Sequence, residues 1–182
     1  MDNYDLIYRQ DKTCLREAVR DYVAGLPYEF SRMSDKEARD SLLSEYNYKV
    51  RSKLKSCRSF GLNIEPGDVC YIDFGRAYVT EAGYQHFGLV LKVFNGKAFV
   101  LPMTSNKTAL ASAYQPDDNP DGMNHLYRIG AIEGLTKESV LFLNDGKFIN
   151  TARIIDVKGH LEPSSKEFRQ VYARFLEVLS PQ

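Results

Sequence analysis

The sequence contains no tryptophan, no excess of charge of either sign and no long run of apolar residues. Lysine plus arginine and aspartate plus glutamate both number 24, so no overall positive field attracts nucleic acid, and any such binding requires a local patch. The most apolar stretch, 87–94, is interrupted by Lys92 and is too short to cross a membrane. At 182 residues and 43% hydrophobic composition, the chain is globular and long enough for one domain of ordinary size.

Cysteine is also scarce. Cys14, Cys57 and Cys70 are odd in number and widely spaced, which predicts reduced thiols in a cytoplasmic protein and no structural zinc. Residues 1–10 are charged throughout and lack the apolar segment of a signal peptide. The sequence therefore predicts a cytoplasmic protein that has no membrane anchor, no metal and no cofactor.

Up to about residue 61 the hydrophobic periodicity is helical. A capping box formed by Ser34 and Glu37 begins one helix, and a weaker helix is predicted over 15–23, ending before Gly25 and Pro27. The longer helix carries an apolar stripe that is expected to pack: Leu42, Leu43, Tyr46, Val50, Leu54 and Cys57. Basic residues within 49–58 allow a nucleic-acid site, but they border both edges of this stripe, which favours side chains that snorkel beside a buried seam.

From residue 66 to about 157 the pattern is that of short strands and turns. Strands are predicted over the following ranges: 69–74, 86–94, 98–104, 140–143 and 149–157. The polar stretch 105–125 is expected to form a long loop, of the kind that is usually functional or mobile. A second capping box, from Ser164 to Glu167, begins a final amphipathic helix. The pattern predicts a mainly β fold with flanking helices (α+β), in which residues 1–62 form a helical extension and residues 63–182 a small barrel with a C-terminal helix.

The dipeptide Asn95-Gly96 predicts a type I′ hairpin between two of these strands. Without a bulge, Leu91 faces Val100 and His86 faces Ser105; a bulge at Pro102 places Thr104 beside His86 instead. In both cases an imidazole meets a hydroxyl group at the open end of the hairpin. One face of the hairpin is apolar throughout and is expected to form the interior: Phe87, Leu89, Leu91, Val93, Ala98 and Val100.

His86 is the centre of the predicted chemistry, since histidine can accept or donate a proton near neutral pH. The preceding loop, residues 75–85, contains Arg76, which can hold a phosphate, and Tyr78 and Tyr84, which can stack on bases. Glu81 in the same loop orders it or contacts a partner. A single histidine near a strand end is more often structural, so these residues alone leave catalysis open.

Four consecutive segments resemble the MazF/PemK toxin family. They are Gly67-Asp68-Val69-Cys70-Tyr71-Ile72-Asp73-Phe74-Gly75, Glu81-Ala82-Gly83, His86-Phe87-Gly88-Leu89-Val90-Leu91 and Leu101-Pro102-Met103-Thr104-Ser105. They are similar in order and spacing to that family's first strand, its glycine- and glutamate-containing loop, its "R-P-x-L-V-L" strand and its "P-I-T-S" strand end. Segments 139–143 and 151–155 lie where the family has its remaining strands.

This resemblance implies a homodimeric SH3-like barrel of the MazF/PemK/CcdB type, which cleaves single-stranded RNA without metal and is held inactive by a cognate antitoxin protein. The family's catalytic threonine falls on Thr104, beside Ser105, and its catalytic arginine falls on His86. We hypothesise that His86 acts as general base or acid and that Arg76 supplies the lost positive charge. Lys107 joins Tyr78, Glu81 and Tyr84 on the expected RNA-binding side.

Two alternatives stay open. The histidine marks a member that binds RNA but cuts it poorly, or the same barrel is a non-catalytic module that binds a protein target, as the gyrase inhibitor CcdB does, or nucleic acid. A cutting groove requires positive potential around Arg76, His86 and Lys107, whereas a protein-binding module requires an exposed apolar patch. The helical extension is expected to cover a dimer surface, to occupy the place of an antitoxin helix, or to brace the barrel.

Overall fold

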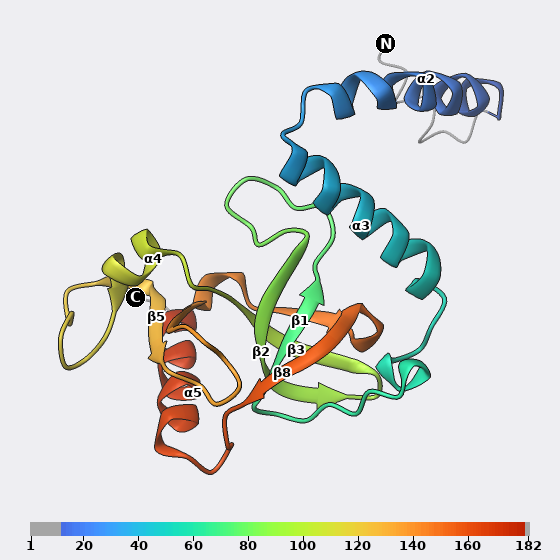
Figure 1. Ribbon diagram of the computed structural model, residues 1–182. Helices are drawn as coiled ribbons and strands as arrows, with labels where there is room; N and C mark the ends of the chain where they lie inside the picture. Colours follow the sequence, from blue (N-terminus) through green and yellow to red (C-terminus); the bar gives the residue numbers. More distant parts are fainter. Residues whose placement is uncertain (1–11, 181–182) are drawn as a thin grey trace. The chain divides into compact units, whose positions relative to one another are not determined.

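The computed structural model describes residues 12–180, and the chain divides into two compact units, residues 1–40 and residues 41–182 (Figure 1). Helix α2 (Lys12–Ser31) belongs to the first unit, and α3 (Asp35–Arg51) begins in the first unit and ends in the second. Residues 1–10, for which the sequence predicts no signal peptide, lie outside the described residues. The domain boundary predicted after residue 62 stays a prediction.

One eight-stranded sheet forms the second unit. Its strands are β1 (Asp68–Asp73), β2 (Gln85–Phe94), β3 (Lys97–Thr104), β4 (Ala113–Tyr114), β5 (Met123–Gly130), β6 (Ser139–Phe142), β7 (Lys147–Asn150) and β8 (Ile154–His160). Their order is β4-β5-β6-β3-β2-β1-β8, and β7 also pairs with β3. The strand predicted over 149–157 is in fact divided between β7 and β8.

The remaining elements of this unit are short turns and two helices. They are the 3₁₀ turns η1 (Cys57–Phe60), η2 (Leu143–Asp145) and η3 (Thr151–Arg153), with helices α4 (Lys107–Ser112) and α5 (Lys166–Leu179). This content confirms the predicted α+β class, mainly β with flanking helices. Over residues 12–180, no helix has the length and apolar character needed to cross a membrane.

The β2–β3 hairpin has the predicted turn but not the predicted register. Asn95 and Gly96 both have positive φ, 40° and 81°, as a type I′ turn requires. A register shift between Val90 and Lys92 makes Leu91 an extra, bulged residue, so Val90 rather than Leu91 faces Val100. A bulge at Pro102 was one of the two possibilities that the sequence left open, and the bulge lies nearer the turn.

The bulge also corrects the prediction that one face of the hairpin is interior. Because one extra residue reverses the facing of side chains beyond it, Leu91 packs in a cluster with α5 whereas Val93 packs in a second cluster on the other face. Val90 and Val100 belong to this second cluster, and Phe87 is 36% exposed. Both faces of the hairpin are therefore covered along most of its length.

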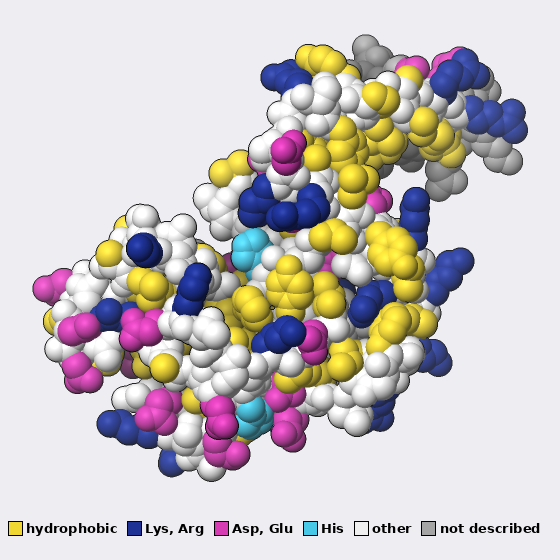
Figure 2. Space-filling model, in the orientation of Figure 1, with side chains coloured by type: hydrophobic (Ala, Val, Ile, Leu, Met, Phe, Trp, Pro, Cys, Tyr) yellow, Lys and Arg dark blue, Asp and Glu magenta, His cyan; other side chains and the backbone are white. Residues whose placement is uncertain are grey.

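Helix α3 ends at Arg51 and does not bury the part of the predicted apolar stripe that it carries, whereas Cys57 of that stripe lies beyond it in η1 and is buried. Its buried residues are Ser41 and Ser44, whereas Leu42 and Tyr46 are 58% and 66% exposed, and hydrophobic side chains are visible on its surface (Figure 2). The expectation was wrong because Ser44 meets a buried carboxylate of the barrel, described below, which selects the polar face for packing.

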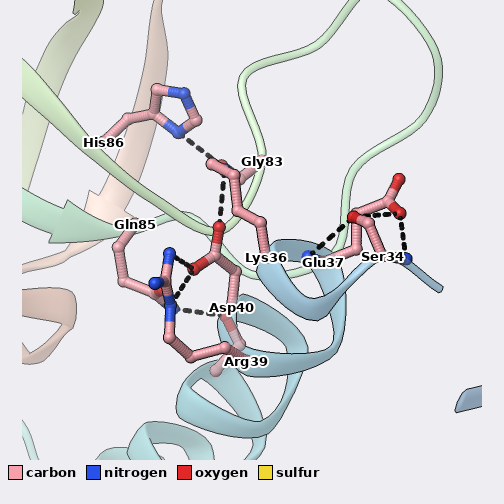
Figure 3. Close-up of polar contacts among 9 residues, drawn as sticks. Ser34, Lys36, Glu37, Arg39, Asp40, Gly83, Gln85 and His86 are labelled. Carbon is pink, nitrogen blue, oxygen red and sulfur yellow. Dashed lines mark hydrogen bonds and ion pairs between the residues drawn. The ribbon is translucent and has the colours of Figure 1, made fainter.

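The two capping boxes behave differently. In α3 the Ser34 amide donates to Glu37 Oε2 at 2.9 Å and the Glu37 amide donates to Ser34 Oγ at 3.3 Å, as predicted (Figure 3). These hydrogen bonds from the Ser34 hydroxyl and amide lower the pKa of Glu37. In α5 the cap is Ser165 rather than Ser164, since Ser165 Oγ accepts from the Phe168 amide at 3.1 Å.

Two further expectations about local structure were wrong. Helix α2 continues through Gly25 and Pro27 to Ser31, although Pro27 has no N–H to donate to the carbonyl of Val23, so neither residue ends the helix. The stretch 105–125 is not one loop: it contains α4 and β4, and Asn106 caps α4 by accepting from two backbone amides.

Candidate functional site

His86 and Thr104 lie at the open end of the β2–β3 hairpin. The last pair in the register is Phe87 with Met103, so one further step places His86 opposite Thr104. Residues opposite one another in a sheet have Cβ atoms about 4.5–5.5 Å apart. Of the two pairings that the sequence left open, the register favours Thr104, while Ser105 lies beyond the strand end and is exposed.

The imidazole of His86 is held in one tautomer by the loop before it. His86 Nδ1 lies 2.6 Å from the carbonyl oxygen of Gly83 (Figure 3). Because a carbonyl oxygen only accepts hydrogen bonds, Nδ1 carries the proton, and Nε2 of the neutral ring keeps its lone pair. The side chain as a whole is half-buried, and in the neutral ring Nε2 is the nitrogen that can accept a hydrogen bond.

The hydroxyl group of Thr104 is oriented by the backbone that follows β3. Thr104 Oγ1 accepts a hydrogen bond from the Asn106 amide at 3.2 Å, which leaves its O–H free to donate. Lys107 begins α4 directly after Asn106 and is exposed. This strand end therefore combines a proton acceptor, a hydroxyl donor and a nearby exposed lysine.

The loop between β1 and β2 is closed at its base and open at its tip. The Tyr84 amide donates to the Gly75 carbonyl at 2.5 Å, and Tyr84 itself is half-buried. At the tip, Tyr78 is 86% exposed, and its amide donates to Glu81 Oε2 at 3.4 Å. Tyr78 is thus available for stacking, whereas Glu81 contributes to the turn.

Asp145 fixes this loop from η2, a role that the sequence did not predict. Its Oδ2 accepts from the Ala82 amide at 2.6 Å, and its Oδ1 lies 2.7 Å from Lys147 Nζ. Because Ala82 directly precedes Gly83, this carboxylate holds the carbonyl that orients His86. The sequence signal for this role of Asp145 is its position two residues before Lys147, which begins β7, a strand that pairs with β3.

The ion pair of Arg76 is with α3 and does not involve His86. Arg76 Nε lies 3.9 Å from Glu45 Oε1 on α3. Asp73 and Gln85 pair across β1 and β2, and because side chains alternate along a strand, they project from the face opposite to that of His86. The predicted role of Arg76 as the charge beside His86 stays a prediction, since no contact within residues 12–180 joins the two side chains.

A buried carboxylate joins α3 to the end of β1. Asp73 is 4% exposed; its Oδ1 accepts from Ser44 Oγ at 2.6 Å and from the Gly75 amide at 3.0 Å. Its Oδ2 accepts from Asn47 Nδ2 at 2.8 Å. Residues 41–51 of the helical extension therefore brace the barrel, which was one of the three expected roles.

Another group of side chains has the composition of a metal site. Ligand atoms of Glu65, Asp68 and His160 lie within 4.8 Å of one another. His160 Nδ1 lies 2.8 Å from Asp68 Oδ1, so these two residues already satisfy each other as a hydrogen-bonded cross-strand pair. The group lies at the start of β1, away from His86, and burial raises the pKa of the Cys70 thiol beside it.

No protein-family model matches the sequence, and no curated protein matches it either. Solved structures similar to this chain include MazF (Form-I) from Deinococcus radiodurans, with 15% identity over 65% of this chain and 97% of that chain and a TM-score of 0.46. The Mycobacterium tuberculosis toxin MazF-mt6 has 12% identity over 62% and 95%, with a TM-score of 0.43. An endoribonuclease in complex with its cognate antitoxin from Mycobacterial species has 12% identity over 66% and 99%, with a TM-score of 0.44. This likeness concerns the fold alone, so the chemistry has to be argued from the site.

Proposed function

We propose that the protein is a toxin-like endoribonuclease that cleaves single-stranded RNA without metal. One observation carries this proposal: the Gly83 carbonyl holds His86 with Nε2 as the proton acceptor, at the strand end that Thr104 shares. RNA supplies its own nucleophile, the ribose 2′-hydroxyl, so the protein needs only a base, charge stabilisation and correct placement.

In the proposed reaction, His86 Nε2 takes the proton of the 2′-hydroxyl, and the 2′-oxygen attacks the adjacent phosphorus. The O2′–P bond forms, the P–O5′ bond breaks, and the departing 5′-oxygen takes a proton from water. The products are a 2′,3′-cyclic phosphate and a 5′-hydroxyl end. The Thr104 hydroxyl donates to a non-bridging phosphoryl oxygen, and Lys107 supplies positive charge at the same strand end.

The RNA-binding part of the proposal uses the exposed loop tip. Tyr78 stacks on a base, with Tyr84 at the base of the loop and Glu81 holding the turn between them. Ser105, exposed beside Thr104, serves as a second hydroxyl donor to the phosphate. We keep the homodimer and the cognate antitoxin as part of this proposal, since exposed apolar side chains on α3, such as Leu42 and Tyr46, offer surface for a protein partner.

The test is cleavage of a mixed-sequence single-stranded RNA in EDTA by the wild type and by a His86→Ala/Thr104→Ala variant. A matched control, His125→Ala, removes a histidine on β5. We expect cleavage with cyclic phosphate ends by the wild type and the control only. Equal cleavage by the double variant would remove His86 and Thr104 from the mechanism. No cleavage by a folded, partner-free wild type would favour the non-catalytic binding module.

A further inference from the structure

A cleft of about 460 Å³ lies between the C-terminal part of α3, the end of β1 and the η3 turn, within the unit formed by residues 41–182. Its charged lining consists of three arginines and two carboxylates: Arg51, Arg76, Arg153, Glu45 and Asp73. His86 and Thr104 do not line it. A space of this size exceeds what a single phosphate ion needs and lies in the range of ligand pockets.

The two carboxylates do not neutralise this cleft. Asp73 is buried and accepts hydrogen bonds from two side chains and one amide, all of them uncharged. Within the part of the chain that the structure describes, Glu45 pairs with Arg76 alone, at 3.9 Å, and both side chains are about half exposed, so the pair is weak. The lining therefore keeps an excess of positive charge in a protein that has no net charge.

Arg51 and Arg153 are held in place by neutral groups. Arg51 Nη1 donates to the carbonyls of Ala152 and Ile154 at 3.1 and 2.9 Å, and its guanidinium lies 4.0 Å from the centroid of the Phe60 ring. Arg153 Nη1 donates to the backbone carbonyl of Asp73, the last residue of β1, and to that of Phe74, both at 3.1 Å. Among the residues with described positions, neither arginine has a carboxylate at ion-pair distance.

Two fixed guanidinium groups with unused N–H donors match the oxygen atoms of a phosphate diester. Tyr48, on the rim of the same cleft, is 67% exposed and can stack on a base. Gly75 and Arg76 line the cleft and begin the loop that leads to His86, so one short loop of the chain connects the cleft with His86.

We propose that this cleft is a second RNA-binding site, which holds phosphodiester groups of the single-stranded substrate outside the bond that is cut. The proposal rests on the endoribonuclease function in taking RNA as the ligand. Arg51 and Arg153 bind the phosphate oxygens, Tyr48 stacks on a base, and Glu45 limits affinity by competing for Arg76.

The test measures binding of labelled single-stranded RNA by anisotropy in the His86→Ala/Thr104→Ala background, where the RNA stays intact. Glu45→Gln and Glu133→Gln each add one unit of positive charge, but Glu133 does not line the cleft. We expect tighter binding for Glu45→Gln, by roughly threefold or more, and little change for the matched control Glu133→Gln, since only charges within about a Debye length of the bound phosphate act strongly.

Arg153→Gln should weaken binding and reduce the slope of log K against log salt by about 0.7, the value for one lost phosphate contact on a single strand. Its thermal unfolding has to be compared with that of the parent, and Glu45→Gln supplies a gain of affinity that misfolding cannot mimic. Equal effects of Glu45→Gln and Glu133→Gln, or an unchanged slope, would overturn the proposal.

Inorganic phosphate and a mononucleotide identify the ligand as RNA or as a small anion. We expect weak competition from both; a mononucleotide that binds as tightly as the RNA and responds to Glu45→Gln would make the cleft a small-molecule site and overturn the proposal. Because binding is measured without cleavage, a wild type that fails to cut RNA would contradict the proposed function and leave this result standing.

Discussion

Helices α3 and α5 start from the same kind of sequence and pack in opposite ways. Both begin at a serine cap and both carry an apolar stripe at helical spacing. Helix α5 buries one apolar row, Phe168, Val171 and Phe175, in the larger core cluster. Helix α3 buries Ser41 and Ser44 and leaves its apolar side chains exposed.

The difference shows that an amphipathic pattern predicts a helix more securely than it predicts the face that packs. Helix α5 lies against an apolar sheet face, where burial of its stripe is favourable. Helix α3 meets a buried carboxylate, which is stable only if hydrogen-bond donors reach it. The face chosen therefore depends on the chemistry of the partner surface.

The largest expected loss of stability comes from a direct comparison of the apolar side chains of α5 and α3. Phe168→Ala in α5 should lower the free energy of unfolding by about 3–5 kcal/mol, because it leaves a cavity in the core. Tyr46→Ala in α3 should change it by less than about 0.5 kcal/mol, because the side chain is 66% exposed. Urea denaturation measures both, and comparable losses would mean that the α3 stripe is packed in solution.

A second comparison exchanges polar and apolar residues on α3. Ser44→Val should cost about 1–3 kcal/mol, because Asp73 loses a donor at 2.6 Å inside the protein. The matched change Leu43→Ser, on the exposed side, should have a far smaller effect. Urea denaturation measures both changes. If Ser44→Val stabilises the protein, the face of α3 that carries Ser41 and Ser44 is not the packed one.

A third prediction concerns the loop that orients His86. Asp145→Ala removes the acceptor of the Ala82 amide, so the Gly83 carbonyl should shift and kcat should fall by roughly tenfold while KM changes little. Asp145→Asn keeps an acceptor oxygen and should restore most of the rate. Nitrogen NMR of His86 should show the Nδ1-protonated tautomer in the wild type and a mixture in Asp145→Ala. An unchanged tautomer would remove Asp145 from this role, even if no cleavage is found.

The smallest expected loss of stability concerns the N-cap of α5, for which Ser164 and Ser165 are the two candidates. Ser165→Ala should cost about 1 kcal/mol of stability, because the Phe168 amide loses its acceptor. Ser164→Ala, the position predicted from the capping-box pattern, should cost less than half of that. Thermal unfolding measures both, and the reverse order would contradict the cap assignment.

Local features of the chain were predictable wherever one short segment contains the whole cause. Asn95-Gly96 requires positive φ at two residues whatever surrounds it, and the turn forms as predicted. His86 and Thr104 were both expected at the open end of the hairpin, and they lie there. The bulge at Leu91 was not predictable, because the choice of bulge position depends on packing against both clusters.

The residues of the cleft beside α3 likewise could not be brought together from the sequence. Arg51 was interpreted as one of the side chains that border a buried seam, and its position against two backbone carbonyls of the η3–β8 region depends on chain that is 101 to 103 residues away. Likewise, the carboxylate of Asp145 and the amide of Ala82 are 63 residues apart in sequence. No local pattern contains such pairs.

The amino-acid order thus specifies the start of α3, the existence of α5, the hairpin turn, the α+β class and the position of His86 and Thr104 at one end of the hairpin, because each follows from periodicity, backbone sterics or the reach of a short turn. Tertiary structure alone selects the packed face of α3, the position of the bulge, the tautomer of His86 and the placement of Arg76 beside Glu45. These depend on the hydrogen bonds and burial that distant segments provide once they meet.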